Sequence, residues 1–320
     1  MKTIKTIRGL ALALLFLLAL HLSARYLGLV LYNMSVRETM VGQGWMGDYA
    51  SYYFGMTKQN SVDTVFVGNS HQFCSVDINL LNREYGENCM LLASSSQGFD
   101  LSCYSVMTAI EMQHPKTIVL ETLAATFSTR SEAPLALCLL GNLPNWLRAK
   151  FLAAKAMGSN EDAQYFPVFY YPICEFHSKW YELRAEDFRL PPRLKDGERF
   201  SFRYTRVEPQ KPWEPIPAER KAPMPAAAAE WLEKIVALCE ENGVRLILYT
   251  APYPASESAQ EIFNGLEDFA REHGLVYRNM MYDTEAIGLD PACDYMDGGH
   301  LNRAGQEKLT RFLAETLLAA

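Results

Sequence analysis

The sequence predicts an α/β fold with three layers, in which helices cover both faces of a mainly parallel β-sheet. Short apolar runs alternate with stretches of helical spacing between residues 61 and 121, a pattern typical of parallel strands joined by crossover helices. The same alternation resumes at residue 226 and continues toward the C-terminus. The chain has 320 residues, of which 49% are apolar, as in a globular protein. A net charge of −7, with scattered basic residues, argues against a nucleic-acid partner.

The N-terminal residues have the order of an export signal, with three basic residues before an apolar run over residues 9–20. The wider stretch 7–31 is long enough to span a bilayer as a helix, and its small-residue cleavage site is poor. We therefore expect a membrane anchor over residues 1–32, with the basic end in the cytoplasm and residues 33–320 outside. The alternative is a signal peptide that is cleaved to release a secreted protein.

The first half of the domain should contribute three strands and two helices. Strands are expected at residues 64–67, 89–92 and 117–120, and helices at residues 78–85 and 101–112. Pro115 separates the second helix from the strand after it, because a helix could not continue through a proline at that point.

An insertion at about residues 122–225 interrupts the alternating pattern. Its first part has apolar residues at helical spacing, over residues 135–140 and 146–157, and then an aromatic cluster, so we expect a helical cover on one side of the sheet. Residues 186–225 are rich in proline and charge, which is typical of a long irregular excursion over the surface. Such a segment could be a lid or binding wall, or equally a mobile flap without a role.

The second half of the domain should add two strands and three helices. Helices are expected at residues 227–241, 256–273 and 303–318, and strands at residues 244–249 and 275–277. Gly274 would close the middle helix at its C-terminal cap. In a doubly wound sheet of this kind the residues that follow the strands face a common crevice, so a site is expected there.

Ser70 is the first candidate for that crevice, since it directly follows the first strand. The turn after a strand leaves a side chain exposed at the edge of the sheet, and Gly68 would let that turn bend tightly. His71 is adjacent to Ser70 in the chain, so its side chain should point away from the partner of the serine. We interpret His71 as a wall or polar-contact residue and not as a base.

His300 is the better candidate for a base, because Asp297 precedes it by three residues in a glycine-rich turn. A carboxylate at one ring nitrogen fixes the tautomer of the imidazole and supports the imidazolium that forms when a serine loses its proton. Asp294 is a competing carboxylate and ranks second. Asp297 and Asn302 could also cap the last helix, and both roles could hold together.

Two separate blocks resemble the SGNH/GDSL hydrolase superfamily. They are Gly68-Asn69-Ser70 after a strand, and Asp297-x-x-His300-Leu301-Asn302-x-x-Gly305 before the last helix. The likeness covers residues 61–121 and 226–318 and implies a flavodoxin-like fold. It assigns Ser70 as nucleophile, His300 as base and Asp297 as carboxylate. The first block departs from the family motif, with Asn69 and His71 in place of Asp and Leu.

The resemblance also implies an oxyanion hole from backbone amides, which stabilise the charge that develops during acyl transfer. Ser70 itself and Gly98, which follows the second strand, match the family's donors; Gly98 could equally be a helix-entry glycine. The family's asparagine block after the third strand is absent, since the chain has Glu121-Thr122 there. The third oxyanion donor is therefore not identified.

Several residues are candidates for contact with the substrate. They are Asn69, His71, Glu121 and Tyr249, near strand ends, and Trp180, in the aromatic cluster. Because sugars have apolar faces that stack on tryptophan and tyrosine, Trp180 could form the floor of a carbohydrate site. The alternative is that this cluster is a small satellite core under a loop.

The blocks and the anchor together resemble membrane-anchored superfamily members that serve acylation of cell-surface polysaccharides. This implies an extracytoplasmic serine esterase or O-acyltransferase acting on glycan acyl esters, with a multispanning membrane acyltransferase as a further partner. The alternative is a catalytically impaired scaffold or polymer-binding subunit, because the asparagine block is absent. No cofactor or metal is expected, since the six histidines lack metal-ligand spacing and the cysteines form no C-x-x-C pair.

Overall fold

The computed structural model describes residues 2–40, 57–128, 177–188, 199, 201 and 204–319. The chain forms two compact units, Met1–Trp45 with Met157–Arg193, and Met46–Ala156 with Leu194–Ala320. We describe each unit by itself. The helices expected over residues 135–140 and 146–157 lie outside the described residues.

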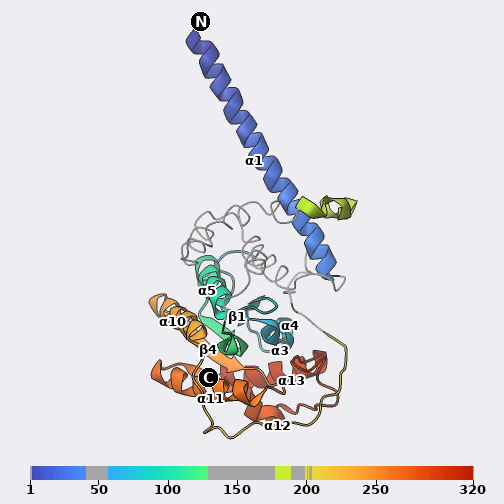
Figure 1. The fold of residues 1–320 in the computed structure, drawn as a ribbon, viewed down its shortest axis with the longest axis vertical. Coiled ribbons are helices and arrows are strands. Elements are labelled where there is room, and N and C mark those ends of the chain that lie inside the picture. The colour runs from blue at the N-terminus through green and yellow to red at the C-terminus, as the bar shows by residue number, and fades with distance from the viewer. Residues whose placement is uncertain are drawn as a thin grey trace. The chain divides into compact units, whose positions relative to one another are not determined.

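The second unit contains a parallel sheet, of which Figure 1 labels β1 and β4. Its strand order is β2-β1-β3-β4-β5. The strands are β1 Thr64–Gly68, β2 Cys89–Ala93, β3 Thr117–Glu121, β4 Arg245–Thr250 and β5 Val276–Asn279. Each predicted strand is confirmed to within two residues. The strand that follows β1 in the chain, β2, pairs with one edge of β1, and the next strand, β3, pairs with the other edge. The carboxyl end of β1 is therefore the topological switch point, where ligands bind in folds of this kind.

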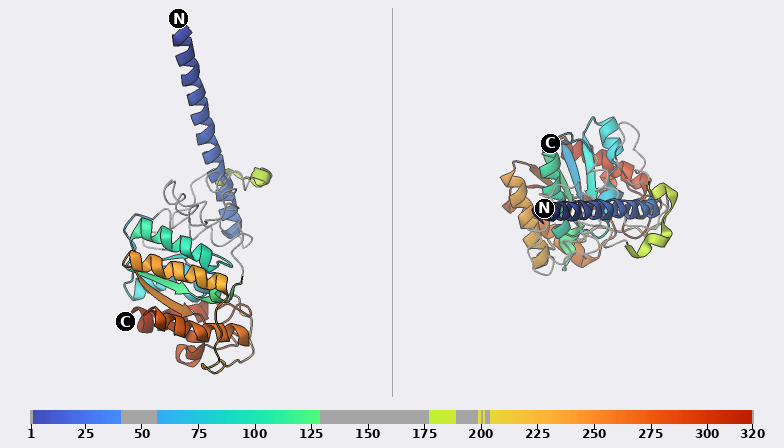
Figure 2. Two further views of the ribbon diagram at one scale, coloured as in Figure 1. Left: turned by 60° about the vertical axis from the view of Figure 1, so that its left-hand side comes forward. Right: turned by 90° about the horizontal axis from the view of Figure 1, so that it is seen from above.

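Helices cover both faces of this sheet, as predicted. They are α3 Ser70–Ser75, α4 Ile78–Glu84, α5 Phe99–Gln113, α10 Ala226–Glu241, α11 Glu257–Glu272, α12 Thr284–Ile287 and α13 Arg303–Leu313, which continues as the π-helix η6 Ala314–Leu318. Helices α5 and α10 pack together on one face (Figure 2), while α3, α4 and α13 pack on the other. Two short helices, α3 and α12, were not expected from the sequence.

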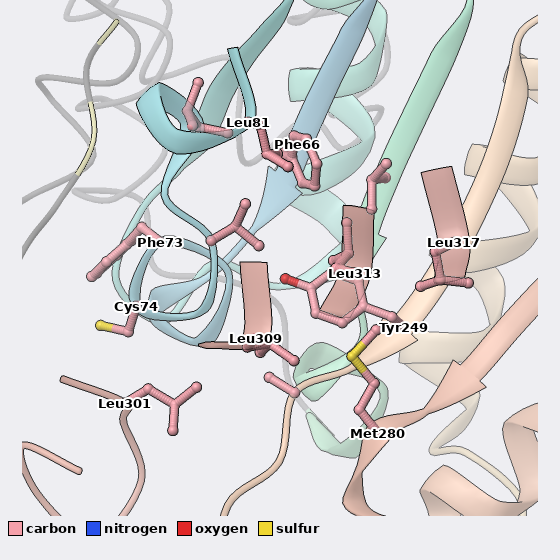
Figure 3. Close-up of a cluster of buried hydrophobic side chains, with 14 of the residues drawn as sticks. Phe66, Phe73, Cys74, Leu81, Tyr249, Met280, Leu301, Leu309, Leu313 and Leu317 are labelled. Carbon is pink, nitrogen blue, oxygen red and sulfur yellow. The ribbon is translucent and has the colours of Figure 1, made fainter. Parts of the chain in front are cut away.

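The core on the α13 side joins elements from both ends of the chain. Figure 3 shows Phe66 of β1 and Tyr249 of β4 in one cluster with Leu309 and Leu313 of α13. Their side chains are no more than 1% exposed. Burying an aliphatic or aromatic side chain contributes about 1.5–3 kcal/mol each, so this cluster fixes α13 and the loop before it against β1.

The described part of the proline-rich excursion, residues 204–225, is fastened to the domain by backbone hydrogen bonds. The amide of Glu208 donates to the carbonyl of Tyr295 over 2.9 Å, and that of Gln210 donates to Pro291 over 2.8 Å. Farther along, the amide of Ala222 donates to Glu261 of α11 over 2.8 Å. This part therefore lies as a wall beside the loop that precedes α13, and not as a free flap.

The first unit contains one long N-terminal helix, α1 (Lys2–Met40), with the 3₁₀ helices η3 (His177–Glu182) and η4 (Ala185–Phe188) in contact with it. The stretch Thr6–Gly28 has 23 residues and a mean hydropathy of 2.0. It is long and apolar enough to be a membrane anchor or a signal sequence. The helix continues eight residues past the boundary expected at residue 32.

Gly305 lies where α13 begins, and the structure explains its place in the Asp-x-x-His-Leu-Asn-x-x-Gly block. A Cβ atom at this position would lie 2.4 Å from the carbonyl oxygen of Asp294 and 3.0 Å from Cδ2 of Leu301. We expect Gly305→Ala to lower the free energy of unfolding by about 1–3 kcal/mol, the cost of overpacking a dense interior. Chemical unfolding of the full chain, followed by tryptophan fluorescence, measures this change.

Gly298→Ala is the matched control, because a Cβ atom there would come no closer than 3.9 Å to Oε1 of Gln210. This variant should unfold at nearly the wild-type denaturant concentration. Equal stability of Gly305→Ala and Gly298→Ala would show that the close approach of α13 to residue 294 is not what requires glycine.

Candidate active site

The nucleophile candidate, Ser70, is the first residue of α3, and Asn69 alone separates it from the end of β1. The chain turns sharply there, and a Cβ atom at Gly68 would lie 2.8 Å from Cβ of Gln72 and 3.1 Å from Cβ of Glu121. Only glycine fits at this turn without displacing backbone. Asn69 caps α3, since its Oδ1 atom accepts a 2.9 Å hydrogen bond from the amide of His71. The sequence therefore fixes the serine at the switch point of the sheet.

His300 and Asp297 lie at the tip of a narrow hairpin before α13. Tyr295 and Leu301 form an antiparallel bridge, and the amide of Met296 donates to the carbonyl of His300 over 2.9 Å. Asn302 closes the hairpin. Its Nδ2 atom donates to the carbonyl of Cys293 over 2.6 Å, and its Oδ1 atom caps α13. The capping role left open for Asn302 is confirmed.

Within the hairpin tip, Oδ1 of Asp297 accepts hydrogen bonds from the amide of Gly299 over 2.8 Å and from the amide of His300 over 2.9 Å. The same oxygen lies 2.9 Å from Nδ1 of His300, and Oδ2 lies 3.0 Å from it. The three-residue spacing thus folds the carboxylate back onto both the backbone and the ring of the histidine. Because an ionised carboxylate only accepts, Nδ1 of His300 carries the proton.

The other nitrogen of the ring, Nε2 of His300, lies 2.8 Å from Oγ of Ser70, although 230 residues separate the two in the chain. With the proton on Nδ1, Nε2 is the acceptor and the hydroxyl of Ser70 donates to it. The side chain of His300 is 24% exposed and Ser70 is half-buried, so an external molecule can reach both. The three residues form a continuous chain of hydrogen bonds, an arrangement that can activate a serine hydroxyl as a nucleophile.

The competing carboxylate, Asp294, has a different partner. It is 1% exposed, and its Oδ2 atom accepts hydrogen bonds from Nζ of Lys308 over 2.6 Å and from the amide of Asp290 over 2.7 Å. Asp297 is therefore the carboxylate that faces the histidine. Partial burial alone would raise the pKa of Asp297, but hydrogen bonds from Gly299 and His300 outweigh it and hold that pKa below its ordinary value.

Gly98 is the N-cap of α5 and follows β2 by five residues, at the same edge of the sheet as Ser70. A buried polar network holds the loop before it. The Nε2 atom of Gln97 donates to the hydroxyls of Ser102 and Ser105 over 3.1 and 3.3 Å, and the hydroxyl of Ser94 donates to Oε1 of Gln97 over 3.2 Å. This network fixes the position of Gly98. That the backbone amides of Gly98 and Ser70 donate to an oxyanion stays a prediction.

Glu121, expected to touch a substrate, is instead 1% exposed and joins the ends of two strands. Its Oε2 atom accepts a hydrogen bond from the amide of Leu123 over 3.0 Å, and Oε1 accepts one from the amide of Ala251, after β4, over 3.3 Å. Burial raises the pKa of Glu121 to about 8, against the lowering effect of these amides. Glu121 is therefore a structural clamp between the ends of β3 and β4 in this fold.

The raised pKa of Glu121 predicts that the stability of the fold decreases between pH 4.5 and about pH 8. The unfolded carboxyl ionises near its ordinary pKa of 4.5, while the folded one keeps its proton to about pH 8. The folded state thus binds more protons in this window, and stability falls as pH rises through it, by at most about 1.4 kcal/mol per pH unit. Unfolding of wild type and Glu121→Gln across this range should show a flatter profile for the variant.

Glu240→Gln, which removes an exposed carboxylate from the end of α10, is the control and should follow the wild-type profile. Parallel profiles for wild type and Glu121→Gln between pH 4.5 and 8 would contradict the assignment of a buried proton to Glu121.

Three other expected contact residues also lie inside the domain. Asn69 is 0% exposed, Tyr249 is 0% exposed within the core and His71 is 5% exposed, so none presents a surface to a substrate here. The reason is that α3, α13 and the segment after β4 cover the strand ends, which strand position alone does not reveal. Trp180 belongs to the first unit and is 68% exposed, with its ring edge-on to Tyr181. Its role with sugars stays a prediction.

Tyr253 was missed by the sequence reasoning. It follows β4 by three residues, and its ring meets the ring of His71 edge-on, with centroids 4.5 Å apart. A signal was available, because residues after the carboxyl end of a parallel strand face the crevice. Tyr249, by contrast, lies inside β4, where alternate side chains point into the core.

Among the residues that the structure describes, no group of three or more His, Cys, Asp or Glu side chains is arranged to hold a metal. In comparisons with known proteins, no family model and no curated protein matches the chain.

Proposed function

We propose that this chain is a serine esterase or O-acyltransferase of the SGNH hydrolase type, acting on acyl esters of cell-surface or exported glycans. One observation carries the proposal: Oγ of Ser70 lies 2.8 Å from Nε2 of His300, whose Nδ1 atom faces Asp297. A histidine ring with a serine hydroxyl at one nitrogen and a carboxylate at the other is an arrangement suited to nucleophilic catalysis.

In the first half-reaction, Oγ of Ser70 attacks the carbonyl carbon of the ester while its proton passes to Nε2 of His300. Asp297 stabilises the imidazolium that forms, because its carboxylate lies within 3.0 Å of Nδ1. The bond between the carbonyl carbon and the alcohol oxygen then breaks, and the proton on Nε2 passes to the leaving alkoxide. The acyl group remains on Ser70 as an ester.

In the second half-reaction, water or a sugar hydroxyl attacks the acyl-serine, and His300 takes the proton of the attacking oxygen and returns it to Oγ of Ser70. Water gives a carboxylic acid, and a sugar hydroxyl gives a new O-acyl sugar. The exposed side of the site, where His300 is 24% exposed and Asp297 is 37% exposed, is open to either acceptor.

Helix α1 supports a location of the reaction outside the cytoplasm. The stretch Thr6–Gly28 would hold the chain at a membrane as an uncleaved anchor, with the domain on the outer side. A multispanning membrane acyltransferase that supplies the acyl group is the partner that suits this location.

The test is hydrolysis of p-nitrophenyl esters by the full chain in detergent, with acetate, butyrate and octanoate as acyl groups. Saturable release of nitrophenolate is expected, with a preference among the three that reports the size of the acyl pocket. Adding a glycan oligosaccharide and analysing it by mass spectrometry distinguishes transfer from hydrolysis. No release above the rate in buffer with any of the esters would contradict the proposal.

A second candidate function is favoured by Glu121, because the strand that carries the asparagine block in the family ends here in a buried clamp. The chain would then be a scaffold or polymer-binding subunit of a cell-envelope acylation system, with the exposed Trp180 and Tyr181 as sugar contacts. Surface acylation that is lost on deletion of the gene but unchanged in a Ser70→Ala strain would favour this candidate over catalysis.

A further inference from the structure

A second histidine, His71, lies beside the catalytic candidate His300 and has no part in the reaction described above. His71 is the second residue of α3, and its amide is fixed by the Asn69 cap. Its side chain is 5% exposed, so it is enclosed by protein and is not a contact for a large substrate.

The ring of His71 stands between two other rings. Its centroid is 5.0 Å from that of His300, with the planes at 60°, and 4.5 Å from that of Tyr253, with the planes at 79°. Tyr253 in turn meets Phe263 of α11 edge-on at 6.3 Å, and Phe263 is 0% exposed. Four rings from four parts of the chain thus form a row that starts in the core and ends at His300. Aromatic pairs at these distances and angles are favourable by about 0.5–1.5 kcal/mol each.

The charge state of His71 suits this place. Burial, together with the neighbouring His300, lowers the pKa of His71 to about 3, against the raising effect of Asp297. His71 therefore stays neutral over the range in which enzymes of this kind work. A neutral ring gives His300 a wall on its inner side without repelling the imidazolium or competing for the carboxylate of Asp297.

We propose that His71 is a positioning residue, whose ring, supported by Tyr253, holds the ring of His300 in the orientation that joins Ser70 to Asp297. This inference rests on the proposed function for its catalytic consequence. Its structural content, that the His300 ring is fixed from the inner side by His71, can be tested without any turnover.

The experiment uses the full chain in detergent with isotopically labelled histidine. Two readouts are compared in wild type, His71→Ala, His71→Phe and Tyr253→Ala: the NMR signal of the Nδ1 proton of His300, and the rate of inactivation by a fluorophosphonate. The proton held between His300 and Asp297 should exchange slowly with water in wild type and in His71→Phe, which keeps a ring of similar shape. It should exchange rapidly in His71→Ala, where the inner wall is missing.

The inactivation rate should fall about 10- to 100-fold in His71→Ala, as expected when a catalytic group is misplaced by about 1 Å, and by no more than about threefold in His71→Phe. Tyr253→Ala, which leaves α3 intact, should reproduce both effects to a smaller extent and serves if His71→Ala does not fold. His273→Ala removes a histidine that packs on Phe269 of α11 instead, and it should change neither readout.

An unchanged His300 proton and inactivation rate in folded His71→Ala would overturn the inference, and so would equal losses in His71→Phe and His71→Ala. If the fluorophosphonate does not label wild type at all, the proposed function fails. In that case the exchange of the Nδ1 proton of His300 with water still tests the positioning role of His71. Slow exchange in wild type with rapid exchange in His71→Ala supports this role, and equal exchange rates in the two proteins refute it.

Discussion

Replacing Ser70 with alanine is expected to lower the hydrolysis of p-nitrophenyl acetate at least about a thousandfold, because the hydroxyl of Ser70 is the group that Nε2 of His300 would activate to form the acyl ester. The stability of the fold should change little. Ser70 is half-buried, and the contact of its hydroxyl with His300 is the interaction that the substitution removes. Initial rates at saturating ester, together with the thermal unfolding of each variant, measure the two effects.

His300→Ala should match Ser70→Ala, and the double variant should be no slower than either single one, because the two groups act as a unit. Ser75→Ala is the matched control from the same short helix: its hydroxyl is buried at the far end of α3, so activity should stay within a few-fold of wild type. Ester hydrolysis by Ser70→Ala at the wild-type rate would mean that another nucleophile acts.

Replacing Asp297 with asparagine should cost about a thousandfold to ten-thousandfold in rate while leaving the hairpin folded. An asparagine oxygen can still accept from the amides of Gly299 and His300, as Oδ1 of Asp297 does at 2.8 and 2.9 Å. Its NH₂ group would then donate to Nδ1 of His300, which moves the ring proton to Nε2. A proton on Nε2 points at Ser70 and prevents the ring from accepting the hydroxyl proton.

Asp294→Asn is the control for this prediction, because Asp294 lies three residues earlier and pairs with Lys308. It should lose some stability, since Asp294 is 1% exposed, but it should keep most of the activity. The hydrolysis rates of the two variants show which carboxylate supports His300, and ¹⁵N spectra of the His300 ring report its tautomer. Equal activity losses in Asp294→Asn and Asp297→Asn would show that the assignment of the carboxylate is wrong.

The order of elements in the sheet domain could be predicted because it rests on local patterns. The apolar run at β1, the periodicity of α10 and the glycine at residue 274, which has φ +64° after the end of α11, each act within a few residues. The Asp297 and His300 pair was predictable for the same reason. A three-residue spacing in a tight turn brings the carboxylate of Asp297 close to the ring of His300 through local contacts.

Burial at the crevice could not be predicted in the same way. Asn69, His71 and Glu121 all fall at strand ends, where a substrate contact is a reasonable expectation, yet each is at most 5% exposed. Their burial depends on how α3, α13 and the segment around Tyr253 close over the sheet edge. That closure is a property of tertiary packing, and no local spacing in the chain encodes it.

The proline-rich excursion shows the same limit. Its composition predicts an irregular surface path, but the hydrogen bonds from Glu208 and Gln210 to the hairpin side of the domain involve partners more than 80 residues away. These bonds make residues 204–225 a fixed neighbour of the Asp297 loop. From composition alone, a mobile flap without a role was an equally good interpretation of this segment.

The most direct test of the central claim is to treat the native full chain with a fluorophosphonate and to locate the adduct by peptide mass spectrometry. A serine activated by His300 should give one phosphonyl group, on Ser70, and labelling should disappear in His300→Ala and after denaturation. An unlabelled Ser70 in the native protein, or labelling that persists equally in His300→Ala, would show that the 2.8 Å contact between Oγ of Ser70 and Nε2 of His300 does not activate the serine.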